Sequence, residues 1–455
     1  MEDIIKDEVL GELDFQEEAW VGSLDAPLYN SDENLTLVIQ DYNKEGILDI
    51  QREAYKTYLQ NEEKYKEIAV DYLLDYYKWN YEYIASEVSG VNEKDHKDVV
   101  TETQLFEFIE LWYLFICRDG SFGYAFGCCW DVDNGLAVLL SEEEPRVISR
   151  TQLENLHKIN ADTIGLLVHD GKNAWKGWKK HSLFGKNEHL EIEFDGKAEE
   201  GITEAQKKAY ANYLKKEDEH FKDFTKMMLT VYMGSESEAE KMLSHGIPIN
   251  VMTILPKTLY IDREGNYGWI CYTEWNKGYV GVLLNKEQPL FMRVGDLKTA
   301  AKYQFINDKD CGMLFTDGVF ADRIEILFYD NKVYSFAMDF QLVEGELTQE
   351  QRKTYKDFMK NKAKYWEDMK DKMLDYYLCI YDDVEANFNV PKEFEKENVT
   401  RDKVLKIIKF SRIHFYEDGG GYFLGECPIA NPDGEVLGFE FTDGEIEIIE
   451  PEEIL

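Results

Sequence analysis

The sequence predicts an α+β protein of three tandem homologous domains, each an antiparallel sheet with one or two long helices inserted between two groups of strands. Two observations lead to this prediction. The segment Gln51–Tyr55 recurs as residues 206–210 and 351–355, at spacings of 155 residues (51 to 206) and 145 residues (206 to 351). A repeat of about 150 residues has the length of a whole domain. The 455 residues, 44% of them hydrophobic, also suffice for three packed cores.

Alternating apolar residues predict a half-buried strand ahead of each helix. The alternation occupies Leu35, Leu37 and Ile39 in the first copy and residues 190–194 and 334–340 in the other two. A glycine follows at positions 46, 201 and 345. We therefore expect the strand to end there in every copy.

The repeated glutamine is expected to have a structural role at the start of each helix. Thr203 with Gln206, and Thr348 with Gln351, have the spacing of a capping box, in which the two side chains satisfy free backbone amides. The first copy has Leu48 at the threonine position, so Asp49 is expected to cap that helix one residue later.

A tyrosine-rich stripe continues from each helix start at spacings of 3, 4 or 7 residues. Three of its columns are Tyr58/Tyr213/Phe358, Tyr65/His220/Tyr365 and Tyr77/Tyr232/Tyr377. This spacing predicts one buried helix face, on a single helix or on two helices broken near Asn61. His220 shares a column with tyrosines, which indicates an aromatic packing residue.

An acidic residue followed by glycine marks a hairpin turn in the second half of each copy. The pairs are Asp119-Gly120, Glu264-Gly265 and Asp418-Gly419, and a final strand is expected at residues 136–140, 279–284 and 436–441. No linker rich in Gly, Ser or Pro separates the copies. The predicted domains are residues 1–155, 156–302 and 303–455, packed directly on one another.

The motifs that resemble chemical sites have simpler structural interpretations. Residues 131–135 (Asp-Val-Asp-Asn-Gly) are similar to a calcium loop, but the glycine comes one residue early and the second copy has a lysine there, so we expect a polar turn. The eight histidines have no metal-ligand spacing, and the seven cysteines include no C-x-x-C pair. We expect no metal, no cofactor and no enzymatic activity.

The net charge of −39, from 90 acidic and 51 basic residues, limits the partners. Such a surface repels nucleic acid and anionic membranes and attracts basic proteins or cations. No apolar run reaches the ~18 residues of a membrane span, and the first residues lack the pattern of a signal peptide. We expect a cytoplasmic protein, and the sequence leaves its oligomeric state open.

One string resembles a known domain family. Trp130-Asp131, followed by residues 135–138 (Gly-Leu-Ala-Val), is similar to the pattern Trp-Asp-x-Glu-His-Gly-Leu-Gly-Val of an uncharacterised bacterial family. That family also tends to have the Gln-x-x-Ala-Tyr helix start. Here Asp133-Asn134 replaces Glu-His, so the histidine of the family pattern has no counterpart in this copy. The resemblance implies three tandem copies similar to bacterial immunity proteins.

These observations favour an acidic protein-binding inhibitor, of the immunity or antitoxin type, that masks a basic toxin or effector. The candidate partner-binding residues are Trp20, Trp175, Trp178, Trp130, Asp131, Asp133 and Trp275. Three alternatives stay open: a decoy that mimics nucleic acid, a scaffolding protein, and an enzyme with its site in one copy. The enzyme would show a pocket with converging polar groups and perturbed acids in a single copy.

Overall fold

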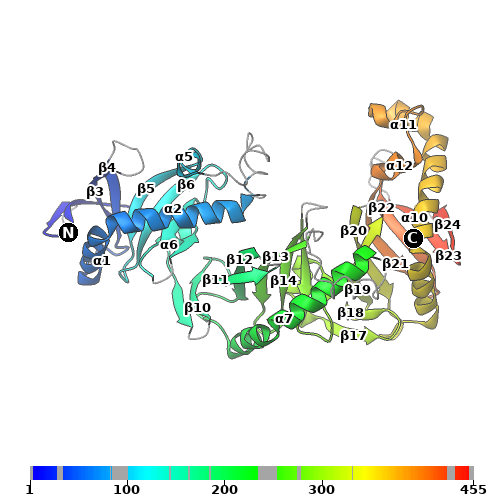
Figure 1. Ribbon diagram of the computed structural model, residues 1–455, viewed down its shortest axis with the longest axis horizontal. Helices are drawn as coiled ribbons and strands as arrows, with labels where there is room; N and C mark the ends of the chain where they lie inside the picture. Colours follow the sequence, from blue (N-terminus) through cyan, green and yellow to red (C-terminus); the bar gives the residue numbers. More distant parts are fainter. Residues whose placement is uncertain are drawn as a thin grey trace. The chain divides into compact units, whose positions relative to one another are not determined.

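The computed structural model contains three eight-stranded sheets with the same strand order (Figure 1). It describes residues 4–27, 34–81, 84, 101–142, 145–161, 164–183, 186–233, 254–273, 278–329, 332–427 and 436–449. Each sheet consists of four consecutive strands, then one or more helices, then four more strands. The chain is therefore an α+β protein with three similar units, as the repeats predicted.

The strands fall in three consecutive groups along the chain. Sheet 1 contains β1 (Ile4–Asp7), β2 (Gly11–Gln16), β3 (Ala19–Pro27), β4 (Asn34–Gln40), β5 (Ile109–Ile116), β6 (Phe122–Cys128), β7 (Leu136–Leu139) and β8 (Arg146–Ile148). Sheet 2 contains β9 (Lys158–Ala161), β10 (Gly165–His169), β11 (Ala174–Leu183), β12 (Lys186–Asp195), β13 (Ile254–Ile261), β14 (Tyr267–Thr273), β15 (Gly278–Leu283) and β16 (Leu290–Met292). Sheet 3 contains β17 (Gln304–Asp308), β18 (Gly312–Thr316), β19 (Phe320–Tyr329), β20 (Lys332–Gln341), β21 (Lys409–Phe415), β22 (Gly421–Glu426), β23 (Val436–Thr442) and β24 (Glu445–Ile449).

The sheets are mixed, which corrects the purely antiparallel sheet expected from the sequence. The central pairs β4–β5, β12–β13 and β20–β21 are parallel. The cause is the long helix between the two strands, because a helical crossover returns the chain to the same end of the sheet. The expected final strands are also not the last ones, since β8, β16 and β24 follow them.

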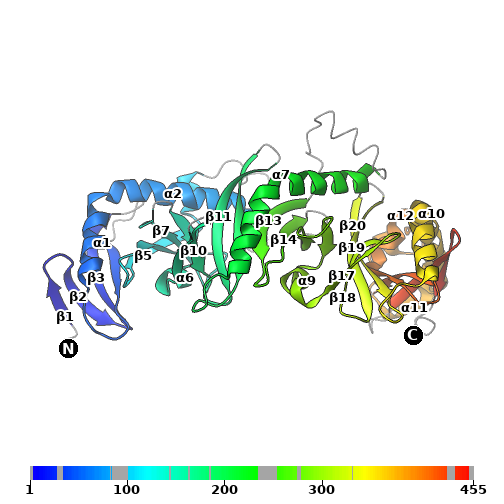
Figure 2. The same cartoon turned by 90° about the horizontal axis from the view of Figure 1, so that it is seen from below.

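The helices lie mainly between the two groups of strands. They are α1 (Asp49–Gln60), α2 (Glu62–Trp79), α5 (Glu102–Leu105), α6 (Arg150–Glu154), α7 (Glu204–Met233), α9 (Val294–Lys298), α10 (Gln349–Cys379), α11 (Tyr381–Asn387) and α12 (Arg401–Val404), with short 3-10 turns at residues 300–302, 392–394 and 405–407. The predicted break at Asn61 occurs in the first copy, where α1 and α2 run in different directions (Figure 2). Helices α7 and α10 are continuous.

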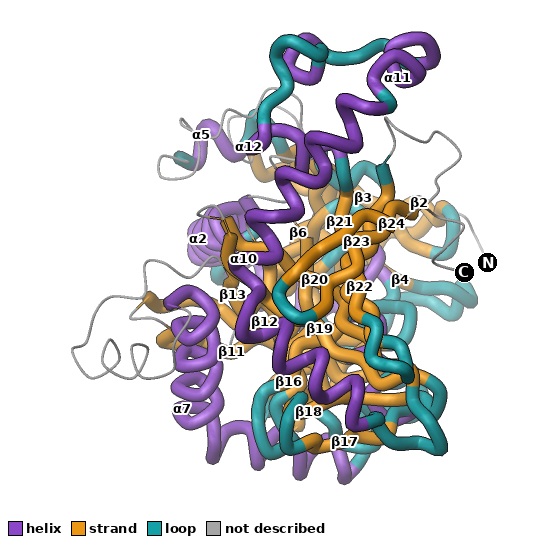
Figure 3. The backbone as a smooth tube through the Cα atoms, turned by 90° about the vertical axis from the view of Figure 1, so that its right-hand side faces the viewer, coloured by secondary structure: helices purple, strands orange, loops and turns teal. Residues whose placement is uncertain are grey.

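The chain divides into two compact units, one of residues 1–189 and 196–201 and the other of residues 190–195 and 202–455. In the first unit, the predicted stripe of α1 and α2 is buried at Tyr58, Leu73 and Tyr77. In the second unit, α10 lies across the strands of sheet 3 and buries the equivalent face (Figure 3). His220 stacks on Tyr213, and its ring is buried, which confirms its packing role. The side chain of Tyr232 lies outside the described residues.

The repeated glutamine joins the start of the helix to the ends of the parallel strands. In the third copy, Gln351 is fully buried, and its Oε1 accepts a bond from Thr348 N at 2.9 Å. Its Nε2 donates to Gln341 O and Phe415 O, the last carbonyls of β20 and β21, at 2.7 and 3.0 Å. Gln206 makes the equivalent bonds, and both predicted capping boxes are present. The structural role predicted for this glutamine is confirmed.

The cap of the first helix differs from the prediction. The N-cap residue is Leu48, whose backbone N–H donates to Gln51 Oε1 at 2.9 Å. Asp49 lies inside the helix and pairs with Arg52 instead of capping. The glutamine half of the capping box therefore persists without the threonine half.

Each acidic-glycine turn approaches the first turn of the long helix. Gly120, Gly265 and Gly419 have φ of +84°, +90° and +93°, which an L side chain adopts only with strain. A Cβ atom at Gly265 would lie 3.1 Å from Ala205 O, and one at Gly419 would lie 3.0 Å from Glu350 Cβ. Backbone conformation and close packing therefore explain these glycines.

Replacing Gln351 by alanine is expected to destabilise the protein by about 2–3 kcal/mol, because it leaves buried backbone groups without partners. Urea unfolding of Q351A measures this loss. The matched control is Q349A, two residues earlier on the exposed side of the same helix start, which is expected to unfold like the wild type. Equal midpoints for the two variants would show that the buried bonds contribute nothing.

Candidate functional site

Three of the predicted partner-binding tryptophans belong to the core. Trp20, Trp175 and Trp130 are 0%, 2% and 6% exposed. The indole N–H of Trp20 donates to the buried Asp41 at 2.9 Å, and that of Trp175 donates to Lys197 O at 3.3 Å. These side chains are not presented to a partner by the folded chain. Trp275 lies outside the described residues.

The other predicted residues retain accessible surface. Trp178 is half-buried against Trp79, with ring centroids 6.5 Å apart. Asp133 is exposed, and Asp131 is half-buried in the turn before β7. Asp131 Oδ1 accepts bonds from the backbone and side chain of Asn134 at 3.2 and 2.9 Å, which makes this segment the polar turn that the sequence predicted.

Titratable side chains form a continuous row in sheet 3, on the face opposite α10. In every sheet, we call the face opposite the long helix or helices of that copy the second face. The strand register aligns Asp322, Asp339, His414, Tyr422, Glu440 and Glu447 across β19 to β24. Such a row brings neighbouring side chains to about 5 Å from one another.

The centre of the row is a buried ionic cluster. Asp339 and His414 are 4% and 7% exposed, and Nδ1 of His414 bonds a carboxylate oxygen of Asp339. The other oxygen, Oδ1, accepts no hydrogen bond from the described residues, although Arg412 Nε lies 3.3 Å away. Arg412 keeps 47% of its side chain exposed and opens the cluster to solvent. A buried carboxylate with spare acceptor capacity can receive a donor from a ligand.

The carboxyl of Asp322 is the perturbed acid of this cluster. Burial, together with the charges of Asp339 and Asp296, raises its pKa to about 6, while Arg293 and Arg412 act in the opposite direction. Two carboxylates opposite each other on neighbouring strands resist simultaneous ionisation. Asp322 therefore changes charge close to neutral pH.

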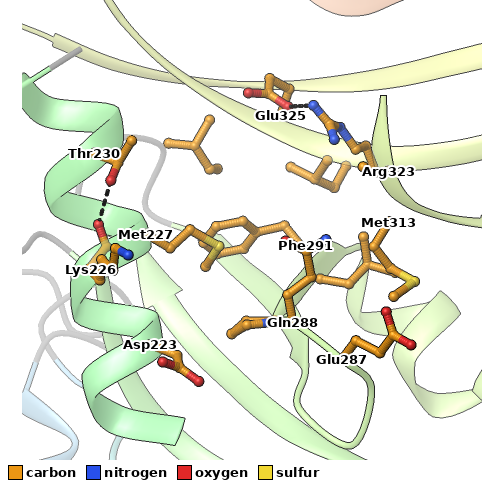
Figure 4. Close-up of a pocket in the computed structure, with 15 residues that line it drawn as sticks. Asp223, Lys226, Met227, Thr230, Glu287, Gln288, Phe291, Met313, Arg323 and Glu325 are labelled. Carbon is orange, nitrogen blue, oxygen red and sulfur yellow. Dashed lines mark hydrogen bonds and ion pairs between the residues drawn. The ribbon is translucent and has the colours of Figure 1, made fainter. Parts of the chain in front are cut away.

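A cavity of about 480 Å³ lies in the second unit, between α7, the turn before β16, and strands β18 and β19 (Figure 4). Met227, Phe291 and Met313 supply apolar walls. Arg323, on β19, is already engaged, since it pairs with Glu325 and donates to Tyr355 Oη at 2.6 Å. The exposed carboxylates of Asp223 and Glu287 stand at the edge of the cavity. An apolar stem with a cationic end, such as a lysine or arginine side chain, suits this lining.

Residues 9–152 and 312–421, more than half of the chain, match the sequence family described as Domain of unknown function (DUF6985). The chain belongs to this family. The two matched segments lie in the first and third copies, and the second copy shares their sheet topology. No curated protein and no solved structure matches the chain.

Two buried thiols in the described part of this DUF6985 protein are poorly suited to nucleophilic attack. Burial raises the pKa of Cys128 to about 11 and that of Cys311 to about 12, so these thiols stay protonated at neutral pH. No group of three or more His, Cys, Asp or Glu residues within the described ranges is arranged to hold a metal. None of the helices described is both long and apolar enough to span a membrane.

Replacing Asp322 by asparagine in this DUF6985 protein is expected to change its stability in a pH-dependent way. The folded pKa of about 6 lies above the ordinary 3.8, so the stability from the bound proton is complete below pH 3.8 and is lost as the pH rises through 6. Asparagine avoids this loss. D322N should therefore be more stable than the wild type by about 1–2 kcal/mol above pH 7.

Thermal unfolding of D322N and wild type at several pH values tests this expectation. The difference in midpoint should vanish toward pH 4. The control is D317N, which removes an exposed carboxylate from the turn before β19 in the same sheet. A D322N difference that stays constant from pH 4 to pH 8 would contradict the elevated pKa.

Proposed function

We propose that the protein is an acidic binding protein of the immunity or antitoxin type, which masks a basic protein such as a toxin or effector. The observation that carries this proposal is the excess of carboxylates over basic side chains, which gives the chain a net charge of −39. Many of them lie on the surface. Exposed examples are Glu8, Glu12, Asp14, Glu17, Glu18, Asp382, Asp383, Glu385, Glu445 and Glu447. Such a surface accelerates association with a basic partner and fixes its orientation.

Two further features support binding over catalysis. The residues shared by the copies, such as Gln351 and Gly419, are used for packing and turns. The cavity of Figure 4 has the lining to hold a basic side chain of a partner, with Asp223 and Glu287 at its edge. A partner anchored in this way would present its basic surface to the surrounding carboxylates.

Co-expression with the products of neighbouring genes tests the proposal. We expect one of these products to inhibit growth alone, to be neutralised by this chain, and to co-purify with it at 50 mM salt. The association rate should fall steeply between 50 and 500 mM salt, because charge attraction is screened. A complete survey of neighbouring products without neutralisation, or an association rate independent of salt, would exclude this function.

An enzyme with a site in the third copy is the second candidate, and one observation favours it. The buried pair of His414 and Asp339, next to Asp322 with its pKa of about 6, has the composition of an acid–base centre. The equivalent pairs are Val38 with Phe115 in the first copy and Glu193 with Tyr260 in the second. If the chain is an enzyme, the variant H414F should abolish neutralisation in the co-expression experiment and leave the affinity for the neutralised protein unchanged.

A further inference from the structure

The second faces of sheets 1 and 2 are covered by the first hairpin of the next copy. On sheet 1, Leu166 and Val168 of β10 are buried in a cluster with Phe115, Ala125 and Leu139. On sheet 2, Met313 and Phe315 of β18 are buried with Tyr260, Ile270 and Leu283. The same surface of the fold therefore receives a β-hairpin twice within this chain.

The corresponding surface of sheet 3 is polar instead of apolar. The strand registers identify equivalent positions without ambiguity, because the parallel central pair is present in every sheet. Phe115 and Tyr260 correspond to His414, and Leu139 and Leu283 correspond to Glu440. An apolar hairpin placed here would bury several charges without partners, at a high free-energy cost.

Part of this surface is accessible on strands β21 to β24. Arg412 and Glu447 are exposed, and Tyr422 and Glu440 are half-buried. Toward β19 the face meets β16 and α7 of the same unit. Phe320 is 37% exposed at that side, and its ring lies 5.8 Å from the ring of His414.

We propose that the second face of sheet 3 is the docking surface for a β-hairpin of a basic partner protein, with lysine or arginine side chains on the docked face. The proposal rests on the function proposed above. The two hairpins seated on sheets 1 and 2 supply the shape argument. Charge supplies the second argument. Four acids lie in the row (Asp322, Asp339, Glu440, Glu447), and the basic groups near them are Arg412, Arg293 and the imidazole of His414.

Aromatic rings complete the surface. Tyr416 packs against His414 and Tyr422, with centroids 4.2 and 4.9 Å away. Lysine and arginine bind the faces of such rings while their charged ends reach nearby carboxylates. The buried Oδ1 of Asp339 accepts no hydrogen bond from the described residues, and its ion-pair partner is Arg412, whose Nε lies 3.3 Å away.

The test uses the full chain and a synthetic β-hairpin with lysine and arginine on one face. The variant E440Q/E447Q removes two charges from the second face of sheet 3. The matched control E8Q/E12Q removes two exposed charges from the β1–β2 hairpin. We expect E440Q/E447Q to weaken binding about 5- to 10-fold and the control to change it less than about 2-fold. Amide hydrogen exchange should slow in β21, β22 and β23 of the wild type on binding.

Three outcomes of this binding test overturn the proposal. Equal weakening by the two variants would indicate non-specific charge attraction. Protection outside sheet 3, or no binding of the hairpin, would exclude this surface while leaving the neutralisation result of the co-expression experiment unaffected. Conversely, hairpin binding at this face without any neutralised neighbour would retain the surface and exclude the immunity-type function.

Discussion

Replacing the polar residues at two surfaces by the apolar residues of the other copies is expected to convert the protein into head-to-tail filaments. At these two surfaces, polar residues stand where the other copies have apolar ones. The first surface is the β1–β2 hairpin, where Glu12 and Asp14 are exposed. The register places a glycine of positive φ at the start of β2, β10 and β18, so Glu12 corresponds to Leu166 and Met313. Asp14 likewise corresponds to Val168 and Phe315. The second surface is the second face of sheet 3.

The variant E12L/D14V gives the first hairpin the residues that dock in the interior of the chain. The variant D339V/H414F/Y422G/E440L gives sheet 3 the residues of sheet 1. Each variant alone presents one half of a junction and should stay monomeric. Together in one chain they create a heterologous contact that does not close, which generates filaments. Burial of these apolar side chains provides the driving force.

Sedimentation velocity and electron microscopy measure the outcome. Mixing the two partial variants should give a one-to-one complex, because each chain offers one complementary surface. The combined variant should form filaments at micromolar concentration. A combined variant that stays monomeric at about 100 µM would show that the internal junctions depend on more than these side chains.

The same residues thus have two compatible consequences. Acids on the first hairpin and on the second face of sheet 3 repel another copy of the chain, and those on the second face of sheet 3 also attract a basic hairpin. Specificity of this kind combines an attractive element for one partner with a repulsive one against the alternative. The terminal, capping repeats of repeat proteins also have polar outer faces, which prevent association with another copy.

The sequence predicted the parts of the fold that recur between the copies. The helix stripe through Tyr58, the capping box of Gln351 and the turn at Gly120 have direct local signals, and the structure contains all three. The first hairpins were missed because their outward residues differ between copies, as Glu12, Leu166 and Met313 show. Strands β8 and β16 have only three residues each, too few for a period of two to be recognised.

The polar row of sheet 3 was missed for a related reason. Comparison of the copies selects positions that stay the same, whereas Asp339 and His414 stand where the other copies differ. The register that aligns them with Asp322 across three strands depends on the parallel central pair, which local patterns do not specify. An excess of ionisable residues in the strands of the third copy was the available signal.

Replacing Gly268 by alanine is expected to be among the most destabilising single changes in the chain, at about 3–4 kcal/mol. A Cβ atom at this position of β14 would lie 2.3 Å from Val282 O and 2.8 Å from Leu297 Cδ1 of α9. Atoms do not approach so closely, so either the strand pairing with β15 or the seat of α9 has to shift.

The chain offers a control with the same chemical change. Gly295, inside α9, has nothing within 4 Å of an added Cβ atom, so G295A should be neutral or should stabilise by up to about 1 kcal/mol. Urea unfolding followed by the fluorescence of the buried Trp269, adjacent to Gly268, reports the difference. Similar midpoints for the two variants would mean that sheet 2 accommodates the extra atom.

The third copy explains why the glycine matters. Its counterpart there is Tyr422, which contributes an aromatic ring to the second face of sheet 3. In sheet 2, by contrast, Leu297 packs directly above Gly268 and Gly281. The absence of a side chain lets α9 approach the strands and complete the apolar cluster that seats the next hairpin. G268A should therefore expose part of this cluster, and faster hydrogen exchange in both β15 and β18 would distinguish a lost junction from a purely local clash.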